Sequence, residues 1–181
     1  MIVDVDKDTY CISVEKTKEK ITNKTKAIMP VHLYGCMANM DGLMELAKEH
    51  GLYIIEDASH SHGSMWKNQY AGTIGDIGCF SFQQGKPLTS GEGGAILTKN
   101  KELYNKLIEI RTNSRVYEDI SMCKMDKMQL KESGTILGTN YCISEFQAAI
   151  LLDQLSKLKE WNKKKEENAK YLDDGLSTIK G

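Results

Sequence analysis

A lysine, a serine and an aspartate follow or lie within short apolar segments of this chain. Ser81 lies in the apolar run 79–82, Lys86 stands five residues after it, and Asp57 follows the apolar run 52–55. Open α/β sheets bind ligands at the carboxyl ends of their strands, so these side chains are predicted to share one site. A lysine amine forms an imine with an aldehyde, and a carboxylate holds a pyridine nitrogen protonated. This combination suits pyridoxal phosphate.

Two other phosphate-binding patterns are excluded by spacing. Lys86 is followed by Pro87, whereas a P-loop lysine is followed by serine or threonine. Gly72, Gly75 and Gly78 repeat every third residue, which is not the GxGxxG pattern of dinucleotide sites. The cluster Gly91-Glu92-Gly93-Gly94, taken alone, is typical of a tight turn.

Alternating strands and helices are predicted to position these residues. Strands are expected at 27–33, 52–56, 79–82 and 95–98. Helices are expected from Asn39 or Asp41 to about 50, where Gly51 ends the helix, and over 101–113, 144–155 and a further stretch to about 174. Residues 115–137 are predicted to form an irregular loop. The alternation predicts an α/β fold.

Five stretches, in order, resemble the DegT/DnrJ/EryC1/StrS family of pyridoxal phosphate-dependent aminotransferases, which make amino sugars and aminocyclitols. They are VDVDKDTY (3–10), TKAIMPVHLYG (25–35), NMDGLMELAKEHGLYIIEDASHSHGS (39–64), GTIGDIGCFSFQQGKPLTSGEGGAILT (72–98) and LGTNYCISEFQAAILLDQL (137–155). The resemblance implies an aspartate-aminotransferase-like large domain, with a mostly parallel sheet, helices on both faces and a homodimeric assembly.

The same resemblance implies a role for each candidate site residue. Lys86 is expected to be the catalytic lysine bound to the cofactor, and Asp57 the partner of the pyridine nitrogen. His60 is expected beside the cofactor's phenolic oxygen and Ser81 at its phosphate. Asn140 matches an asparagine that reaches the phosphate of the neighbouring subunit's cofactor, although Cys142 replaces the arginine that usually follows it. His62 is expected to support the turn, and Glu56 to point away from the site.

The implied reaction moves an amino group from glutamate or glutamine to a nucleotide-linked keto-sugar or a keto-cyclitol. The sequences of the segments QQGKPLTSGEGG and DASHSHG favour the branch that uses glutamine and cyclitol ketones. A dehydratase branch has histidine at the lysine position, so Lys86 favours transamination. Two alternatives stay open: a non-catalytic remnant of the fold that binds no cofactor, and a metal-binding α/β protein that uses Asp57, His60 and His62.

The family has an upstream segment with a Gly-Thr phosphate loop and a downstream small domain, and neither has a counterpart among these stretches. The chain is therefore interpreted as an internal fragment: 1–155 as the central and C-terminal part of the cofactor-binding large domain, and 156–181 as a helix leading toward the small domain.

Composition restricts the class of protein. The 181 residues carry a formal net charge of −1, so neither a nucleic-acid surface nor a membrane patch is expected. No run approaches the roughly 20 apolar residues of a membrane helix, and no metal ion is expected. The five cysteines are odd in number and lack CxxC spacing, which favours a reducing, cytoplasmic setting.

Overall fold

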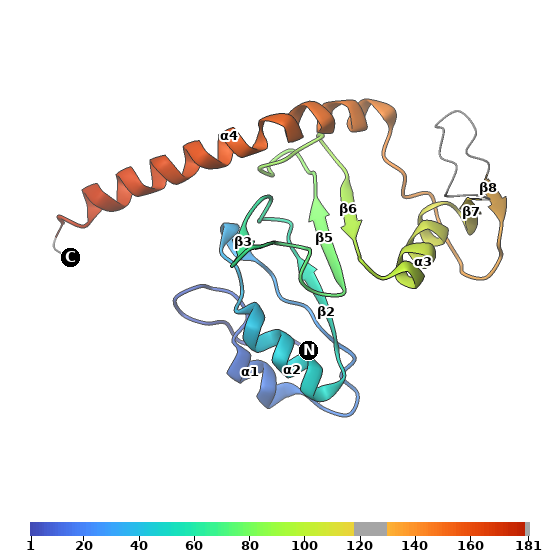
Figure 1. The fold of residues 1–181 in the computed structure, drawn as a ribbon, viewed down its shortest axis with the longest axis horizontal. Helices are drawn as coiled ribbons and strands as arrows, with labels where there is room; N and C mark the ends of the chain where they lie inside the picture. The colour runs from blue at the N-terminus through green and yellow to red at the C-terminus, as the bar shows by residue number, and fades with distance from the viewer. Residues whose placement is uncertain (118–129, 180–181) are drawn as a thin grey trace. The chain divides into compact units, whose positions relative to one another are not determined.

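The computed structural model describes residues 1–117 and 130–179 (Figure 1). The chain forms two compact units, one of Met1–Leu97 with Glu145–Gly181 and one of Thr98–Ser144. The first unit contains the main sheet. The predicted domain boundary at residue 155 falls within the long helix α4 (Glu145–Leu176), and the division proposed there stays a prediction.

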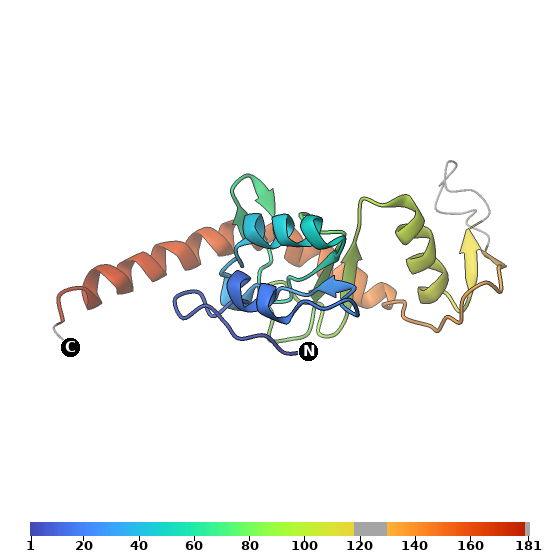
Figure 2. The same ribbon diagram turned by 90° about the horizontal axis from the view of Figure 1, so that it is seen from below.

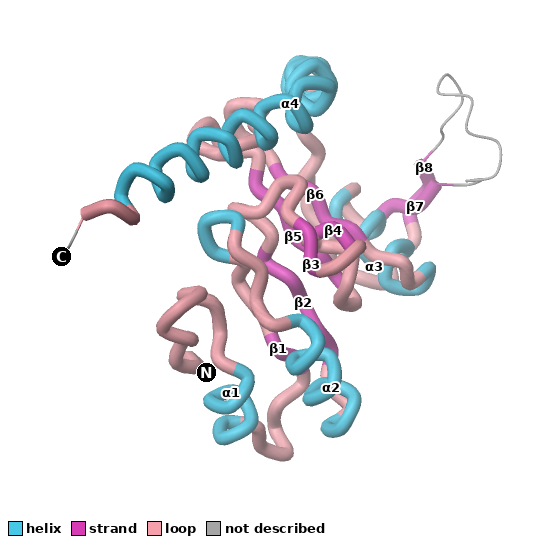
Figure 3. Tube along the Cα trace, turned by 60° about the vertical axis from the view of Figure 1, so that its left-hand side comes forward, coloured by secondary structure: helices cyan, strands magenta, loops and turns pink. Residues whose placement is uncertain are grey.

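The main sheet has four strands in the order β1 (Ala27–Ile28), β2 (Tyr53–Asp57), β5 (Ile77–Ser81) and β6 (Gly94–Leu97) (Figure 3). β1, β2 and β5 are parallel, and β6 is antiparallel to β5. The predicted α/β class with a mostly parallel sheet is confirmed. The short hairpin of β3 (Met65–Trp66) and β4 (Gln69–Tyr70), which was not expected, connects β2 to β5.

The strand predicted over 27–33 is shorter in the structure. Regular pairing covers Ala27–Ile28, a single bridge joins Val31 to Asp57, and a 3-10 turn occupies Leu33–Gly35. Pro30 explains part of the difference, because proline lacks the N–H that a ladder needs. Its carbonyl still accepts from Asp57 N at 2.8 Å, so the chain stays alongside β2 as far as the site.

Two helices lie side by side and cover one face of the sheet (Figures 1 and 2). They are α1 (Val14–Lys20) and α2 (Met40–His50). α2 begins and ends as predicted: the Asn39 side chain accepts from Gly42 N at 3.1 Å, and Gly51 adopts a left-handed conformation with φ 64°. Leu43, Leu46 and Ala47 pack against Ile28 and Ile54 to form the core.

The opposite face of the sheet is exposed in this unit. Side chains alternate across a strand, so Ile54 and Glu56 point into the core while Tyr53, Ile55 and Asp57 point to the other side. The exposed large apolar side chains on this open face are Met29, Val31, Tyr53 and Ile96. The helices α1 and α2 therefore leave this side of the sheet open.

The long helix α4 runs past the carboxyl ends of β2 and β5 (Figure 1). Two helices were predicted over this range, but the structure has one, and residues 145–174 contain neither glycine nor proline to interrupt it. Leu158, Trp161 and Asn162 are half-buried, and every residue of α4 after Asn162 is exposed. Among the described residues, no helix is both long and apolar enough to cross a membrane.

The second unit contains α3 (Lys101–Arg111) and a two-stranded antiparallel sheet of β7 (Arg115–Tyr117) and β8 (Leu130–Glu132). The irregular loop predicted over 115–137 is wrong at these two strands, which are too short to show a clear alternation. Its residues 118–129 lie outside the described part. Glu109 is buried here and accepts hydrogen bonds from Ser133 and from Thr135.

Candidate active site

Asp57 ends β2 at the carboxyl edge of the sheet. Both of its backbone polar groups bond to the segment after β1, because its N–H donates to Pro30 O at 2.8 Å and its carbonyl accepts from His32 N at 3.0 Å. Asp57 Oδ1 accepts from Ser59 N at 3.1 Å, which holds the carboxylate at the start of the next loop. The side chain is half-buried on the open face, so the sequence prediction placed it correctly at a strand end.

Ser81 ends β5, the neighbouring strand. Asp57 and Cys79 are partners in the parallel ladder, and Ser81 lies two residues further on, so all three side chains point to the open face. Burial raises the pKa of the Cys79 thiol, and the nearby Asp57 carboxylate raises it further. Ser81 Oγ accepts from Gln83 N at 3.3 Å, and a hydroxyl that accepts in this way can also donate its O–H to a ligand.

Lys86 lies in the loop that leaves β5. Its backbone N–H donates to Gln83 O at 2.9 Å, and the loop closes where Phe82 N donates to Gly93 O at 2.8 Å. The Lys86 side chain is half-buried. Gly91 and Gly93 both have positive φ, 87° and 141°, which confirms the tight turn expected from the glycine cluster. Lys86, Ser81 and Asp57 thus come together at one end of the sheet.

His62 links the two strand ends. It is buried, and its Nε2 donates to the Ser81 carbonyl at 3.0 Å. Burial lowers the pKa of His62, the hydrogen bond to Ser81 opposes that effect, and the charge of Lys86 lowers the pKa further, so the ring is neutral at pH 7. Its backbone carbonyl accepts from Asn162 Nδ2 of α4 at 2.8 Å. His62 therefore ties the loop after β2 to both β5 and α4.

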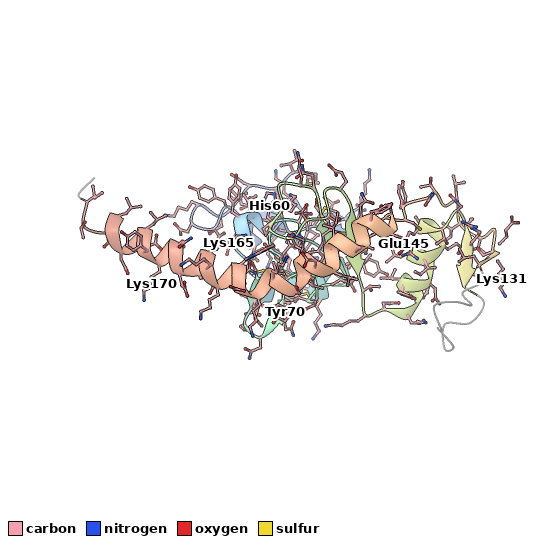
Figure 4. The ribbon with its side chains drawn as sticks, turned by 90° about the horizontal axis from the view of Figure 1, so that it is seen from above. His60, Tyr70, Lys131, Glu145, Lys165 and Lys170 are labelled. Atoms are coloured by element: carbon pink, nitrogen blue, oxygen red, sulfur yellow. The ribbon has the colours of Figure 1, made fainter. Side chains whose placement is uncertain are left out.

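His60 lies in the same loop and stacks on Tyr34. The ring centroids are 5.7 Å apart and the planes are inclined by 22°. Tyr34 is exposed and has the left-handed backbone conformation φ 53°, ψ 30°, which is uncommon outside glycine. His60 Nδ1 is buried and has no hydrogen-bond partner among the described residues. Figure 4 looks down on α4 and shows His60 and Lys165 in this part of the molecule.

Glu56 is a structural residue whose partners the sequence did not reveal. It is fully buried, and its carboxylate accepts from His32 Nε2 at 3.0 Å and from the backbone N–H groups of Gly72, Ile74 and Gly75 at 2.7–2.8 Å. Burial alone raises the pKa of Glu56, but these four hydrogen bonds outweigh it, so the pKa is lowered. Gly72 and Gly75, two of the three glycines whose spacing failed as a dinucleotide motif, thus donate backbone N–H groups to a buried carboxylate.

Asn140, the fifth candidate residue, lies in the second unit. It pairs with Thr112 through an antiparallel bridge, and its Oδ1 accepts from Cys142 N at 3.2 Å. Both Asn140 and Cys142 are exposed. The structure therefore places Asp57, His60, Ser81 and Lys86 in the first unit, whereas Asn140 contacts Thr112 and Cys142 within the second unit.

The geometry does not support the metal-binding alternative. Among the described residues, no three His, Cys, Asp or Glu side chains are placed to hold a metal ion. His62 uses Nε2 for the Ser81 carbonyl, and Asp57 Oδ1 accepts from Ser59. Within the described part of the chain, Asp57, His60 and His62 are therefore not placed to act together as metal ligands.

Solved structures with this arrangement define the class of protein. The chain superposes on an aminotransferase from Psychrobacter cryohalolentis with a TM-score of 0.87 and 36% identity, covering 97% of this chain and 45% of that one. It also matches the E. coli GDP-4-keto-6-deoxy-D-mannose-3-dehydratase, solved with bound hydrated PLP, with a TM-score of 0.82 and 30% identity over 97% of this chain and 46% of that one. The fold is that of PLP-dependent aminotransferases.

The family follows from the sequence. The model of the DegT/DnrJ/EryC1/StrS aminotransferase family matches residues 1–181, and the chain belongs to this family. One relative, the L-glutamine:2-deoxy-scyllo-inosose aminotransferase of Streptomyces fradiae, is 42% identical over 176 residues, which are 97% of this chain and 41% of the relative. The chain thus spans less than half the length of the relatives it matches. The membership inferred from the five motifs is confirmed.

Proposed function

We propose that this chain carries the cofactor-binding core of an aminotransferase that moves the amino group of L-glutamine to a keto-cyclitol. The observation that supports this most directly is that Asp57 and Ser81 end the neighbouring strands β2 and β5, while Lys86, in the loop after β5, is close enough to His62 for its charge to lower the pKa of that ring. The Streptomyces fradiae relative, an L-glutamine:2-deoxy-scyllo-inosose aminotransferase, favours glutamine over glutamate and a cyclitol over a nucleotide-linked sugar.

The residues present fit pyridoxal phosphate. Ser81 keeps an O–H that can donate to a phosphate, the Asp57 carboxylate keeps acceptor capacity for a pyridine N–H, and the buried His60 Nδ1 has no partner among the described residues. When bound, the cofactor supplies an aldehyde that reacts with amines and a ring that stores electrons.

Each residue would then have a defined role in the proposed reaction. Lys86 would hold the cofactor through Nζ and would carry a proton to and from the substrate carbon. Asp57 would keep the ring nitrogen protonated, because a charge-assisted hydrogen bond favours that state. His62 positions Ser81 by holding its carbonyl, and it stays neutral because it is buried.

The proposal also covers the assembly of the protein and its location in the cell. We propose a homodimer in which Asn140 reaches the cofactor phosphate of the partner subunit. Exposed apolar side chains on α4, among them Phe146, Ile150 and Leu152, are suited to such an interface.

A cytoplasmic setting is supported by the free thiols of Cys11, Cys36, Cys79 and Cys142, the four cysteines within the described residues.

Borohydride trapping followed by mass spectrometry tests the cofactor assignment. With pyridoxal phosphate added, we expect a pyridoxyl group on Lys86 that is lost in Lys86→Ala and kept in Lys163→Ala, which removes an exposed lysine of α4. Asp57→Asn should keep the pyridoxyl group but slow amino transfer by at least tenfold, because a neutral amide does not hold the ring nitrogen protonated.

The assay uses this chain alone and this chain joined to the remaining segments of the Streptomyces fradiae relative. A pyridoxyl group on another lysine would contradict the assignment of Lys86. No trapping in either form would instead favour the non-catalytic alternative. Transfer of ¹⁵N from the α-amino group of glutamine to 2-deoxy-scyllo-inosose, compared with transfer to a nucleotide-linked keto-sugar, tests the substrate class.

A further inference from the structure

Two cysteines that are 25 positions apart meet in the first unit. Cys11 is buried, and its thiol donates to the backbone carbonyl of Cys36 at 3.4 Å. Burial raises the pKa of the Cys11 thiol, the backbone N–H of Leu33 lowers it, and the Cys36 thiol raises it again through its charge and a hydrogen bond. The two thiols therefore lie side by side, although their positions in the sequence show no CxxC spacing.

Local hydrogen bonds hold both cysteines in place. The chain folds back on itself before Cys11, where Asp6 N donates to Cys11 O at 2.8 Å. Cys36 follows the 3-10 turn Leu33–Gly35, and its N–H donates to the carbonyl at the start of that turn at 2.9 Å. Because each backbone is fixed by its own turn, the contact between the two thiols is part of the fold of this unit.

The two thiols differ in their access to solvent. Cys36 is exposed, whereas Cys11 is only 2% exposed. A dissolved oxidant therefore reaches Cys36 first, and Cys11 is placed directly behind it. An accessible thiol with a second thiol beside it is the arrangement of redox-sensing cysteines. Within the described part of the chain, no third His, Cys, Asp or Glu joins the pair to hold a metal ion.

We propose that Cys11 and Cys36 form a reversible disulfide when the chain meets a small disulfide such as oxidised glutathione. The Cys36 thiolate attacks one sulfur of that molecule, a bond from Cys36 Sγ to this sulfur forms, and one glutathione thiolate leaves. The Cys11 thiolate then attacks Cys36 Sγ and releases the second glutathione. The two thiol protons pass to the two glutathione thiolates, so both cysteines are oxidised and one glutathione disulfide is reduced. The inference rests on the fold and does not depend on the proposed activity.

The disulfide fixes the turn that carries Tyr34. Tyr34 stands two residues before Cys36, and its ring stacks on His60 with 5.7 Å between the ring centroids. A covalent bond at Cys36 holds this turn against the N-terminal segment and restricts the aromatic ring beside the candidate active site. Because Cys36 is exposed, the bond stays open to attack by reduced glutathione, which reverses it.

Peptide mapping after treatment with oxidised glutathione tests the proposal. The remaining thiols are blocked with N-ethylmaleimide, and the chain is digested with trypsin, which leaves Cys11 in peptide 8–16 and Cys36 in peptide 27–48. We expect these two peptides to be linked, with a combined mass two hydrogen atoms below that of the separate peptides. Excess reduced glutathione, added before the blocking step, should separate them.

Three variants make the test specific. Cys36→Ser removes the exposed thiol and should abolish the linked peptides. Cys11→Ser should leave Cys36 carrying about tenfold more glutathione than in the unchanged chain, because no second thiol displaces it. Cys142→Ser is the control, since it removes an exposed cysteine of the second unit and should keep the linked peptides.

Three results would overturn the proposal. The first is equal glutathione on Cys36 in the unchanged chain and in Cys11→Ser. The second is a linked peptide that joins Cys36 mainly to a cysteine other than Cys11. The third is linkage of peptides 8–16 and 27–48 to the same extent in urea as in buffer, because the fold would then not be what brings the two thiols together.

Discussion

Glu56 shows how much one residue can stabilise this fold. Its carboxylate accepts four hydrogen bonds, and three of them come from backbone N–H groups in the loop 72–75. A hydrogen bond to a charged group contributes more than one to a neutral group, and leaving buried donors unpaired is costly. Glu56 therefore holds the connection between β2 and β5 in the shape that places Asp57 and Ser81 together.

Replacing Glu56 with glutamine should lower the free energy of unfolding by about 3 kcal/mol, because the amide NH₂ faces donors that then lack an acceptor. Urea unfolding measures the loss. The control Glu102→Gln removes an exposed carboxylate paired with Lys106 and should leave stability unchanged. Equal stability of Glu56→Gln and the unchanged chain would contradict this role.

The same residue predicts how stability depends on pH. The pKa of Glu56 is lower in the folded chain than in the unfolded chain, so its contribution is complete above its ordinary pKa of about 4.3 and disappears as the pH falls through the folded value. Unfolding curves between pH 7 and pH 3 should show this loss in the unchanged chain. In Glu56→Gln the same range should show a smaller slope.

The site could be predicted at this scale because its signals are local. Asp57, Ser81 and Lys86 each follow or end an apolar run, and alternation along the strands places the first two on one face. The contact between His62 and Asn162 could not be predicted, since the two residues are 100 positions apart and no pattern in the sequence links them. Glu56 shares this property, because its partners lie 16–24 residues away.

At the scale of helices and strands, the ends of an element could be predicted only where residues at those ends mark them. α2 was predicted at both ends because Asn39 and Gly51 mark them directly. α4 was divided in two because its composition changes near residue 156, yet nothing in the sequence there breaks a helix. The strand at 27–33 was overextended because an apolar run does not show where its partner strand ends.

The position of α4 against the sheet depends on Gly63. Gly63 has φ 89°, and a Cβ there would lie 2.6 Å from Asn162 Nδ2, the group that donates to the His62 carbonyl. Gly63→Ala should therefore lower the free energy of unfolding by about 2 kcal/mol, from backbone strain and from the lost hydrogen bond. Gly51→Ala is the control: φ is 64° but nothing lies within 4 Å, so strain alone should cost about 1 kcal/mol.

Hydrogen exchange distinguishes the two variants. In Gly63→Ala the amides of α4 up to Asn162 should exchange faster, whereas in Gly51→Ala they should not change. If both variants lose the same stability and α4 is protected equally in both, then α4 is not held by this contact.

For the molecule as a whole, exposed apolar surface and low net charge both favour self-association. The formal net charge is −1 and the sequence isoelectric point is about 6.4. One face of the main sheet exposes Met29, Val31, Tyr53 and Ile96. A group of exposed apolar side chains of this kind marks a surface for other protein to cover. Near zero net charge, electrostatic repulsion no longer opposes contact between such surfaces.

We therefore expect the isolated chain to self-associate most strongly near pH 6.4 and less at pH 8.5, where its negative charge is larger. Static light scattering at fixed concentration measures this. Tyr53→Glu and Tyr171→Glu add the same charge, but Tyr53 lies on the open sheet face and Tyr171 on the exposed end of α4. If the open face drives association, Tyr53→Glu should reduce scattering at pH 6.4 severalfold more than Tyr171→Glu. Equal effects of the two variants would show that net charge alone is responsible, and that the open face has no special part in the contact.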